Sequence, residues 1–497
     1  MPGLSKSKIL ANCQCPKRLW LQSHQPELAE EDKSSASRMA AGDAIGEVAR
    51  ALVPDGILID EGDLSAALRQ TQAVLALRPR RPLFEATFEY SGVLIRADLL
   101  IPEGQRSYQM VEVKSSTEVK DYYFSDAAVQ AWVARNAGVN IGRVEVAHVN
   151  NRFIYPGRGR YEGLLTHVDV KREINALAPQ ITGWVDAARM TVTGSKPKIP
   201  TGAQCTDPFP CPFHTHCRSS EGHFGIPFPV SSLPRDRKLV RALEAEGFRD
   251  LRDVPPDRFS RPAHKRMLDA INTGRAFVSA ELEGILNNCP YPHRFVDFES
   301  VNPALPIWPG TRPYAQIPFQ WSCHVQSRPG AEVEHQDFLA GTPDDPRREF
   351  TESLVQVLGD SGTVFVYNAG FEKARMREMA EIHPEHAGAL RLAMERIVDL
   401  LPLAREHYYH PDMQGSWSIK FVLPTVAPDL AYDDLVIAGG SMAQDAYVEL
   451  LRTDLEPDRR SKLRGELLEY CKRDTLALVR VVHFFAGRKA DVEKGGS

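Results

Sequence analysis

Alternation of apolar and polar residues in the first part of the chain predicts a strand hairpin followed by a strand–helix–strand unit. Ser91-Gly92 separates two alternating runs as a turn would. Helical periodicity before the hairpin is broken between Cys13 and Pro16. The expected strands are 84–90, 93–101, 108–113 and 143–150, and the expected helices are 4–10, 18–21, 40–52 and 126–136.

The pattern then changes twice. Residues 223–285 predict short helices with glycines at their ends, over 233–246 and 262–274. From residue 286 the pattern is again that of an α/β domain. There the expected strands are 294–299, 319–325, 337–339 and 363–367, and the expected helices include 348–358 and, as the longest, 466–484.

These changes predict three regions of an α/β protein. A chain of 497 residues is long enough for two or three domains. We expect a first α/β domain over 1–222, a small helical module over 223–285 and a second α/β domain over 286–490. The rhythm of the module is similar to that of helix-hairpin-helix modules, which grip a phosphate backbone; a plain helical spacer is the alternative.

Composition narrows the class of protein. With 43% hydrophobic and 25% charged residues, the chain can form real cores and does not have the composition of a disordered protein. It contains no apolar run of bilayer length, and its start is not followed by a signal-peptide core, so we expect a cytoplasmic protein without a membrane partner. A net charge of −5 weakly opposes nucleic-acid binding, although net charge says nothing about local patches.

A first constellation of polar residues accompanies the strands of the first domain. Asp98 is expected at the end of one strand, and Glu112 and Lys114 on the next. Side chains two apart on a strand share a face, so Asp98 can join this pair. Two carboxylates can then hold a divalent cation that activates water, while the lysine polarises a phosphate. Gln130 falls on the following helix. Surface polarity is the alternative for such a pattern.

A second constellation belongs to the second α/β domain. Asp297 and Glu299 alternate on one strand, and Glu372 follows a later strand. Tyr470 and Asp474 lie four apart on a predicted helix, hence on one side of it. Four acids from three elements can bracket two divalent ions, Mg²⁺ or Mn²⁺, which stabilise the entering and leaving oxygens of a phosphodiester.

Four of the eight cysteines bracket the first domain: Cys15 at its start, and Cys205, Cys211 and Cys217 at its end. In a cytosolic chain, clustered cysteines indicate metal binding before disulfides. Four thiolates suit a [4Fe–4S] cluster or tetrahedral zinc. Buried free cysteines are the alternative, and Cys13 could replace Cys15.

The first domain resembles the RecB-like branch of the PD-(D/E)xK nucleases. The resemblance implies that Asp98, Glu112, Lys114 and Gln130 form the catalytic site, with Asp98 and Glu112 as metal ligands. The family's usual tyrosine is Ala134 here. The cysteine arrangement is similar to that of an iron–sulfur subgroup. This implies that Cys15, Cys205, Cys211 and Cys217 hold a [4Fe–4S] cluster, with zinc as the alternative.

The second α/β domain resembles the DnaQ-like exonucleases of the RNase H fold, whose motifs are D-x-E, N-x-x-F-D and Y-x-x-x-D. The resemblance implies a two-metal 3′–5′ exonuclease in which Tyr470 orients the attacking water. Its metal ligands would be Asp297, Glu299, Glu372 and Asp474. Glu372 stands where the family has aspartate, and Asp399 could serve as a substitute ligand.

Together the order of domains resembles a bacterial family of uncharacterised dual-nuclease proteins. We therefore expect a metal-dependent nuclease that acts on nucleic acid, DNA rather than RNA, in repair, recombination or defence. A non-cleaving binding protein with degenerate nuclease folds and an RNA-processing exonuclease are the alternatives. The sequence has no P-loop motif, so any unwinding would come from a helicase or another repair or defence protein in trans.

Overall fold

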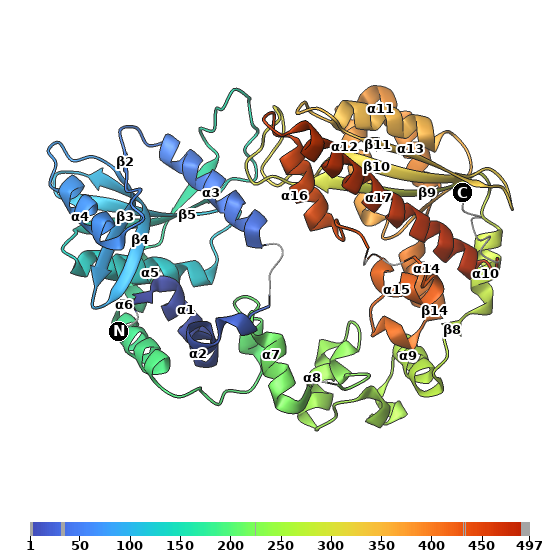
Figure 1. The fold of residues 1–497 in the computed structure, drawn as a ribbon, viewed down its shortest axis with the longest axis horizontal. Coiled ribbons are helices and arrows are strands. Elements are labelled where there is room, and N and C mark those ends of the chain that lie inside the picture. The colour runs from blue at the N-terminus through green and yellow to red at the C-terminus, as the bar shows by residue number, and fades with distance from the viewer. Residues whose placement is uncertain (1–2, 31–34, 224, 431, 433, 489–497) are drawn as a thin grey trace. The chain divides into compact units, whose positions relative to one another are not determined.

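A computed structural model describes residues 3–30, 35–223, 225–430, 432 and 434–488 (Figure 1). The chain forms two compact units. Unit 1 comprises Met1–Phe224 with Pro303–Ala315, and unit 2 comprises Gly225–Asn302 with Gln316–Ser497. Each is a mixture of helices and sheet, in agreement with the predicted α/β class. Among the described residues, no helix is both long and apolar enough to cross a membrane.

Unit 1 is built on a seven-stranded sheet of order β2-β3-β4-β5-β6-β7, with β1 paired to β4. The predicted hairpin is confirmed: β3 and β4 are antiparallel and turn at Ser91-Gly92, where both residues have positive φ. β5 and β6 are parallel and joined through a helix, as the predicted strand–helix–strand unit requires. The strands are β1 Leu4–Ser5, β2 Ile57–Leu58, β3 Leu83–Tyr90, β4 Val93–Glu103, β5 Ser107–Lys114, β6 Ile141–Val149 and β7 Leu165–Asp169.

Helices cover both faces of this sheet. On one face α5 contacts β3, β4 and β6, and α1 and α6 pack against α5. On the other face Ile45 and Ala49 of α3 pack against apolar side chains of the strands. The break predicted between Cys13 and Pro16 separates α1 from α2 at Cys15. The helices are α1 Lys6–Gln14, α2 Pro16–His24, α3 Ser35–Ala51, α4 Leu64–Leu75, α5 Asp121–Asn136, α6 Lys171–Thr193 and α7 His214–Arg218.

A segment from far along the chain completes unit 1. Tyr155 donates its N–H to the carbonyl of Thr311 (2.9 Å) and accepts from the N–H of Gly310 (2.8 Å). The hydroxyl of Tyr314 donates to the carbonyl of Ser115, the residue that follows β5. This segment lies within the region expected to form a separate second domain, so the fold does not follow the chain order alone.

Unit 2 contains a five-stranded sheet of order β11-β10-β9-β12-β13. Its first three strands are antiparallel, whereas β9, β12 and β13 are parallel. A separate pair, β8 with β14, lies beside the short helices of the module. The strands are β8 Phe277–Val278, β9 His293–Val301, β10 Ile317–Gln326, β11 Val333–Leu339, β12 Thr363–Val366, β13 Ile397–Asp399 and β14 Tyr408–Tyr409.

Alternation along β9 assigns its two faces. Val296 and Phe298 pack with α11, α12 and α13, whereas Phe295 packs with the side of α17 and the module. Asp297 therefore lies on the face of β9 that α17 covers. The helices are α8 Arg237–Ala245, α9 Pro262–Thr273, α10 Ala280–Asn287, α11 Arg347–Leu358, α12 Gly370–Ile382, α13 Ala387–Glu395, α14 Leu400–His407, α15 Ile419–Val426, α16 Gly440–Leu450 and α17 Pro457–Phe485.

Candidate functional site

Three of the predicted acids of unit 2 converge. One carboxylate oxygen from each of Asp297, Glu299 and Asp474 lies within 4.8 Å of the others. Two come from alternate positions of β9 and the third from α17, which packs across that face. We call this group, with the nearby Glu372, the acidic site. Hard oxygen ligands at this spacing suit a divalent cation such as Mg²⁺.

Burial and mutual repulsion dominate the electrostatics of the acidic site. Burial, and after it the charge of Asp474, raise the pKa of Glu299 to about 8. Asp297 behaves alike: burial raises its pKa well above the usual value, and the charges of Asp474, Glu299 and Glu372 add to this. The pKa of Asp474 rises to about 6, again because of burial. Without a cation, ionising all of these carboxylates at neutral pH has a high free-energy cost.

Three groups that the sequence analysis did not select contact the acids or act on their charge. Tyr432 donates its hydroxyl hydrogen to Oδ1 of Asp474 at 2.5 Å. The charge of Lys420 opposes the rise of the pKa of Glu299 and Asp474. Cys471 lies with its sulfur 3.8 Å from Oδ2 of Asp297. The motifs named in the sequence analysis pointed to none of these three residues.

Glu372 is placed close to the other acids but outside their closest group. It lies in the first turn of α12, is 3% exposed, and its Oε2 has no hydrogen-bond partner in the described structure. Burial raises its pKa to about 8. A buried carboxylate oxygen without a partner is costly unless a cation binds it. Glu372 therefore fits the role of a metal ligand.

Asp399, the substitute ligand considered above, is already engaged. Its Oδ1 accepts from the N–H groups of Asn368 and Leu401, at 2.9 and 3.0 Å, and its Oδ2 accepts from that of Ala369 at 3.0 Å. It caps α14 and fixes the turn in which Asn368 has φ +72°. This places Asp399 in a structural role that positions the segment before Glu372.

Tyr470 is buried one helical turn before Asp474 on α17 and hydrogen-bonds to it. Burial and the neighbouring acids raise its pKa, so the phenol stays protonated at neutral pH. A neutral hydroxyl beside carboxylates can orient a water molecule but cannot act as a base.

The candidate site of unit 1 also assembles. Glu112 and Lys114 point to the same face of β5, and their side chains form an ion pair of 2.7 Å. Gln130 of α5 donates its amide hydrogen to Oε2 of Glu112. Asp98 lies inside β4 rather than at its end, which corrects the expected position. Pairing of β4 with β5 stops at Leu99, and the Asp98 carboxylate accepts from the N–H of Val113 at 2.6 Å in place of a ladder bond.

Two further residues complete this site: Lys6 from α1 and Asp126 from α5. Lys6 Nζ lies 2.8 Å from Oε1 of Glu112 and 3.0 Å from Oδ1 of Asp126. Lys114 Nζ bridges the same two carboxylates, at 2.7 and 2.6 Å. Burial acts to raise the pKa of Glu112, but the two lysines outweigh it and hold that pKa well below its usual range. The carboxylates of this site are thus paired directly with two lysines, whereas Lys420 acts on the acidic site without an ion pair to it among the described residues.

The predicted cysteine set is brought together. Cys15, Cys205, Cys211 and Cys217 all line one small cavity, and Cys13 is exposed and is not among its lining residues. The amide of Gln14, beside them, donates to the carbonyls of Gln204 (2.8 Å) and Phe209 (2.7 Å), which joins α1 to the last segment of unit 1.

The spacing of these sulfurs bears on what could occupy the cavity. Tetrahedral zinc with Zn–S bonds near 2.3 Å requires sulfurs about 3.8 Å apart. Among the described residues, no three of the cysteine sulfurs lie within 4.8 Å of one another. Burial raises the pKa of Cys211 and Cys217, while Arg18 and Lys17 oppose the rise. The sulfurs are therefore not spaced as ligands of a single tetrahedral zinc ion would be, and the two cations can balance thiolate charge.

Comparison with known proteins finds a match to one family model, mostly within unit 2. Residues 294–418 match the family model described as "Domain of unknown function (DUF2779)". This segment includes Asp297, Glu299 and Glu372 but ends before α17, which supplies Asp474. The family description states no activity.

Two relatives are similar to part of the chain at low identity. "Uncharacterized protein MG366" from Mycoplasma genitalium is 23% identical over 239 residues, which cover 44% of this chain and 35% of that protein. "Uncharacterized protein UU173" from Ureaplasma parvum serovar 3 is 22% identical over 211 residues, 38% of this chain and 30% of that protein. The chain thus spans about a third of the length of these relatives.

The acidic site predicts a pH dependence of stability in the presence of a chelator. Glu299 has a folded pKa of about 8 against an ordinary value of 4.5. Its protonated carboxyl therefore contributes to the free energy of unfolding in full below about pH 4.5, and this contribution to stability is lost as pH rises through 8. We expect Asp474→Asn, which removes a repelling charge, to reduce the loss of stability between about pH 5 and about pH 9 by more than about 1 kcal/mol.

Hydrogen exchange of β9 and α17 across this pH range measures the effect. Asp269→Asn, at an exposed position of α9, is the matched control and should keep the wild-type pH dependence. Equal pH profiles for Asp474→Asn and wild type would contradict the electrostatic account.

Lys6 yields a second prediction. Replacing Lys6 by Met leaves Glu112 and Asp126 with one cation instead of two, so we expect unit 1 to lose about 2 kcal/mol of stability in a chelator. Mg²⁺ should restore part of this loss in Lys6→Met, because a divalent ion can bind the uncovered carboxylates. Hydrogen exchange of α5 reports both effects. Lys8→Met is the control on the same helix, because Lys8 Nζ contacts only the carbonyl of Gly3 among the described residues. Equal losses of stability in both variants would refute the prediction.

Proposed function

We propose that this protein is a metal-dependent nuclease, with DNA the preferred substrate over RNA, and that the acidic site is its main catalytic centre. The observation that carries the proposal is the convergence of Asp297, Glu299 and Asp474 within 4.8 Å, beside the unpartnered Oε2 of Glu372. Raised pKa values in such a cluster are typical of functional sites. The resemblance to DnaQ-like exonucleases supplies the reaction class and the expected 3′–5′ direction.

Each residue of the acidic site has a role in this proposal. Asp297, Glu299, Glu372 and Asp474 would hold Mg²⁺ or Mn²⁺, and the metal would activate water and neutralise the charge that develops on the phosphate. Tyr470 orients the attacking water through its neutral hydroxyl. Tyr432 fixes the Asp474 carboxylate through the 2.5 Å hydrogen bond, and so acts as a positioning residue.

The site of unit 1 is the second nuclease centre of the proposal, with Asp98 and Glu112 as ligands, Lys114 at the phosphate and Gln130 orienting Glu112. Lys6 and Lys114 already neutralise Glu112 and Asp126, which lowers the demand for a metal ion. For this reason we rank the unit 1 site below the acidic site. The RecB-like assignment of this unit rests on the sequence resemblance.

We further propose that Cys15, Cys205, Cys211 and Cys217 hold a [4Fe–4S] cluster of structural function. Support comes from the shared cavity and from sulfur spacings wider than one zinc ion needs. Bound there, the cluster would fasten the first two helices to the 205–217 segment. A cytoplasmic location and a helicase acting in trans remain expectations from the sequence.

Activity should depend on the acidic site. Protein purified anaerobically is incubated with Mg²⁺ or Mn²⁺ and end-labelled single- and double-stranded DNA and RNA. We expect Asp297→Ala to lower the cleavage rate by about 10³-fold, because a metal ion supplies several kcal/mol to the transition state.

Asp98→Ala, the Asp98/Asp297 double variant and the exposed-site control Asp269→Ala run in parallel. Loss of activity in Asp98→Ala alone would reverse the ranking of the two sites. A wild-type protein that cleaves none of the substrates with either metal would show that the enzyme proposal is wrong.

Metal content tests the cysteine proposal. Anaerobically purified protein should contain iron and acid-labile sulfide, and Cys211→Ser should lose both together with stability of unit 1. Cys13→Ser is the matched control, since Cys13 is exposed and is not among the lining residues, and it should keep the iron. Stoichiometric zinc without iron would show that the cysteines hold zinc and not an iron–sulfur cluster. A metal-free protein would show that they are buried free cysteines.

A further inference from the structure

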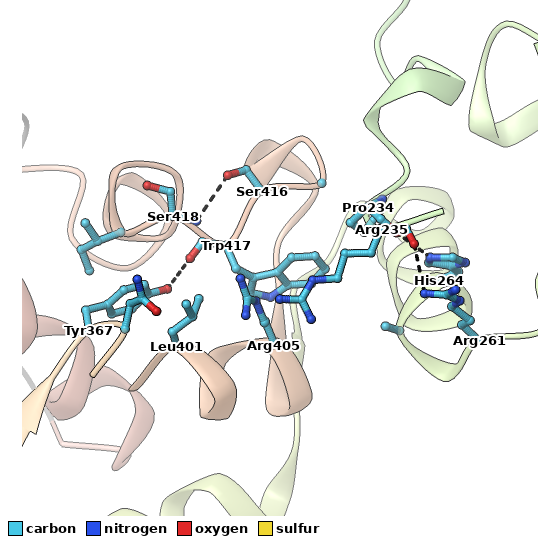
Figure 2. A pocket seen from close by; sticks show the side chains of 14 residues that line it. Pro234, Arg235, Arg261, His264, Tyr367, Leu401, Arg405, Ser416, Trp417 and Ser418 are labelled. Atoms are coloured by element: carbon cyan, nitrogen blue, oxygen red, sulfur yellow. Dashed lines mark hydrogen bonds between the residues drawn. The ribbon is translucent and has the colours of Figure 1, made fainter. Parts of the chain in front are cut away.

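A second feature of unit 2 lies outside the acidic site. A cavity of about 710 Å³ opens between residues of the helical module and residues of the α/β part of the same unit (Figure 2). We call it the arginine pocket after Arg235, Arg261 and Arg405, whose side chains line it. None of its fourteen described lining residues is acidic. The pocket is therefore strongly positive in a protein of net charge −5.

Two of the arginines are unpaired. Arg261 contacts Asp236 at 3.4 Å and donates to the carbonyl of Arg235 at 3.2 Å. By contrast, neither the Arg235 nor the Arg405 guanidinium has an ion-pair or hydrogen-bond partner among the described residues. Arg405 is partly buried, and its pKa is lowered by that burial and by the charge of Arg235. The charge of Asp399 acts on the pKa of Arg405 in the opposite direction, but that carboxylate is bound by backbone N–H groups and forms no ion pair with Arg405 among the described residues. Two neighbouring guanidinium groups without an ion pair favour an anion between them.

The wall opposite the module is held in place by hydrogen bonds. Tyr367 donates its hydroxyl hydrogen to the carbonyl of Trp417 at 2.6 Å, and the Trp417 indole N–H donates to the carbonyl of Tyr408 at 2.9 Å. Figure 2 shows Arg405 beside Trp417, with Ser416 and Ser418 above them in this view. Arg235 and Asn368 both have positive φ, at 57° and 72°. Non-glycine residues in that region concentrate at functional sites.

Chain continuity connects this pocket to the acidic site. Tyr367 and Asn368 line the pocket and lie just before Glu372 in the chain. Ser418 and Ile419 line it too, directly before Lys420, whose charge acts on Glu299 and Asp474. The same two segments thus supply a wall of the pocket and groups of the acidic site.

We propose that the arginine pocket binds backbone phosphates of the single nucleic-acid strand whose end enters the acidic site. This inference rests on the proposed nuclease function and adds the position at which the nucleic-acid strand is bound.

Guanidinium groups bind phosphate oxygens through paired, charge-assisted hydrogen bonds. Cavities of this size hold ligands of about one or two nucleotides. The helical module would then take part in nucleic-acid binding through Arg235 and Arg261.

Binding is measured apart from cleavage. Asp297→Asn serves as the inactive background, and a short fluorescein-labelled single-stranded DNA is titrated in a series of salt concentrations. We expect Arg405→Ala and Arg235→Ala each to weaken binding about tenfold or more. The double variant should also reduce the salt slope by about 1.4, from two lost phosphate contacts on a single strand.

Two further variants control for charge and folding. Arg237→Ala removes an exposed arginine of α8 that is not among the lining residues and should keep the affinity. Arg405→Lys retains the charge but not the paired hydrogen bonds and should recover only part of the affinity. Thermal unfolding of each variant verifies that it is folded.

The outcomes separate this inference from the proposed function. Unchanged affinity and salt slope in folded Arg235/Arg405 variants would overturn the inference, while cleavage by wild type would leave the nuclease proposal intact. Arginine-dependent binding in a protein that cleaves nothing would overturn the nuclease proposal alone. Weakened binding of inorganic phosphate or a free nucleotide, with strand binding unaffected, would make the pocket a small-anion site and refute strand binding.

Discussion

The placement of several carboxylates together in a buried position is the constraint around which unit 2 is organised. Asp297 and Glu299 share a face of β9, and α17 brings Asp474 against them. Burial raises the pKa of all three, and repulsion by neighbouring acids adds to the rise for Asp297 and Glu299, which makes the metal-free site unfavourable at neutral pH. This cost and the unpartnered oxygen of Glu372 are the physical basis for the proposed cation at the site.

Unit 1 meets the same electrostatic problem with its own side chains. Lys6 and Lys114 bridge Glu112 and Asp126, and the pKa of Glu112 falls instead of rising. Because Lys6 belongs to the first helix, the site is complete only when α1 packs against α5. The next helix begins at Cys15, so one N-terminal segment links the carboxylates of unit 1 to its cysteine cavity.

Positive charge in unit 2 is distributed in a complementary way. Carboxylates gather on the side of β9 that faces α17, whereas Arg235 and Arg405 gather in a pocket that shares two chain segments with them. A polyanion bound at the arginines would be attracted by the pocket and repelled by bare carboxylates, and a bound cation would remove that repulsion. The low net charge of the chain therefore results from regions of opposite charge within unit 2 and does not mean that its surface is neutral throughout.

The sequence by itself determined the α/β class, the hairpin at Ser91-Gly92 and the identity of most acids, because strand alternation and turn residues are local properties. It also assigned Asp297 and Glu299 to one face. It could not show that Asp98 accepts the N–H of Val113, nor select Lys6, Asp126 or Tyr432, since their roles depend on contacts between elements distant in sequence. The inclusion of Pro303–Ala315 in unit 1 and the arginine pocket were likewise decided by tertiary packing, which alone sets which charges become neighbours.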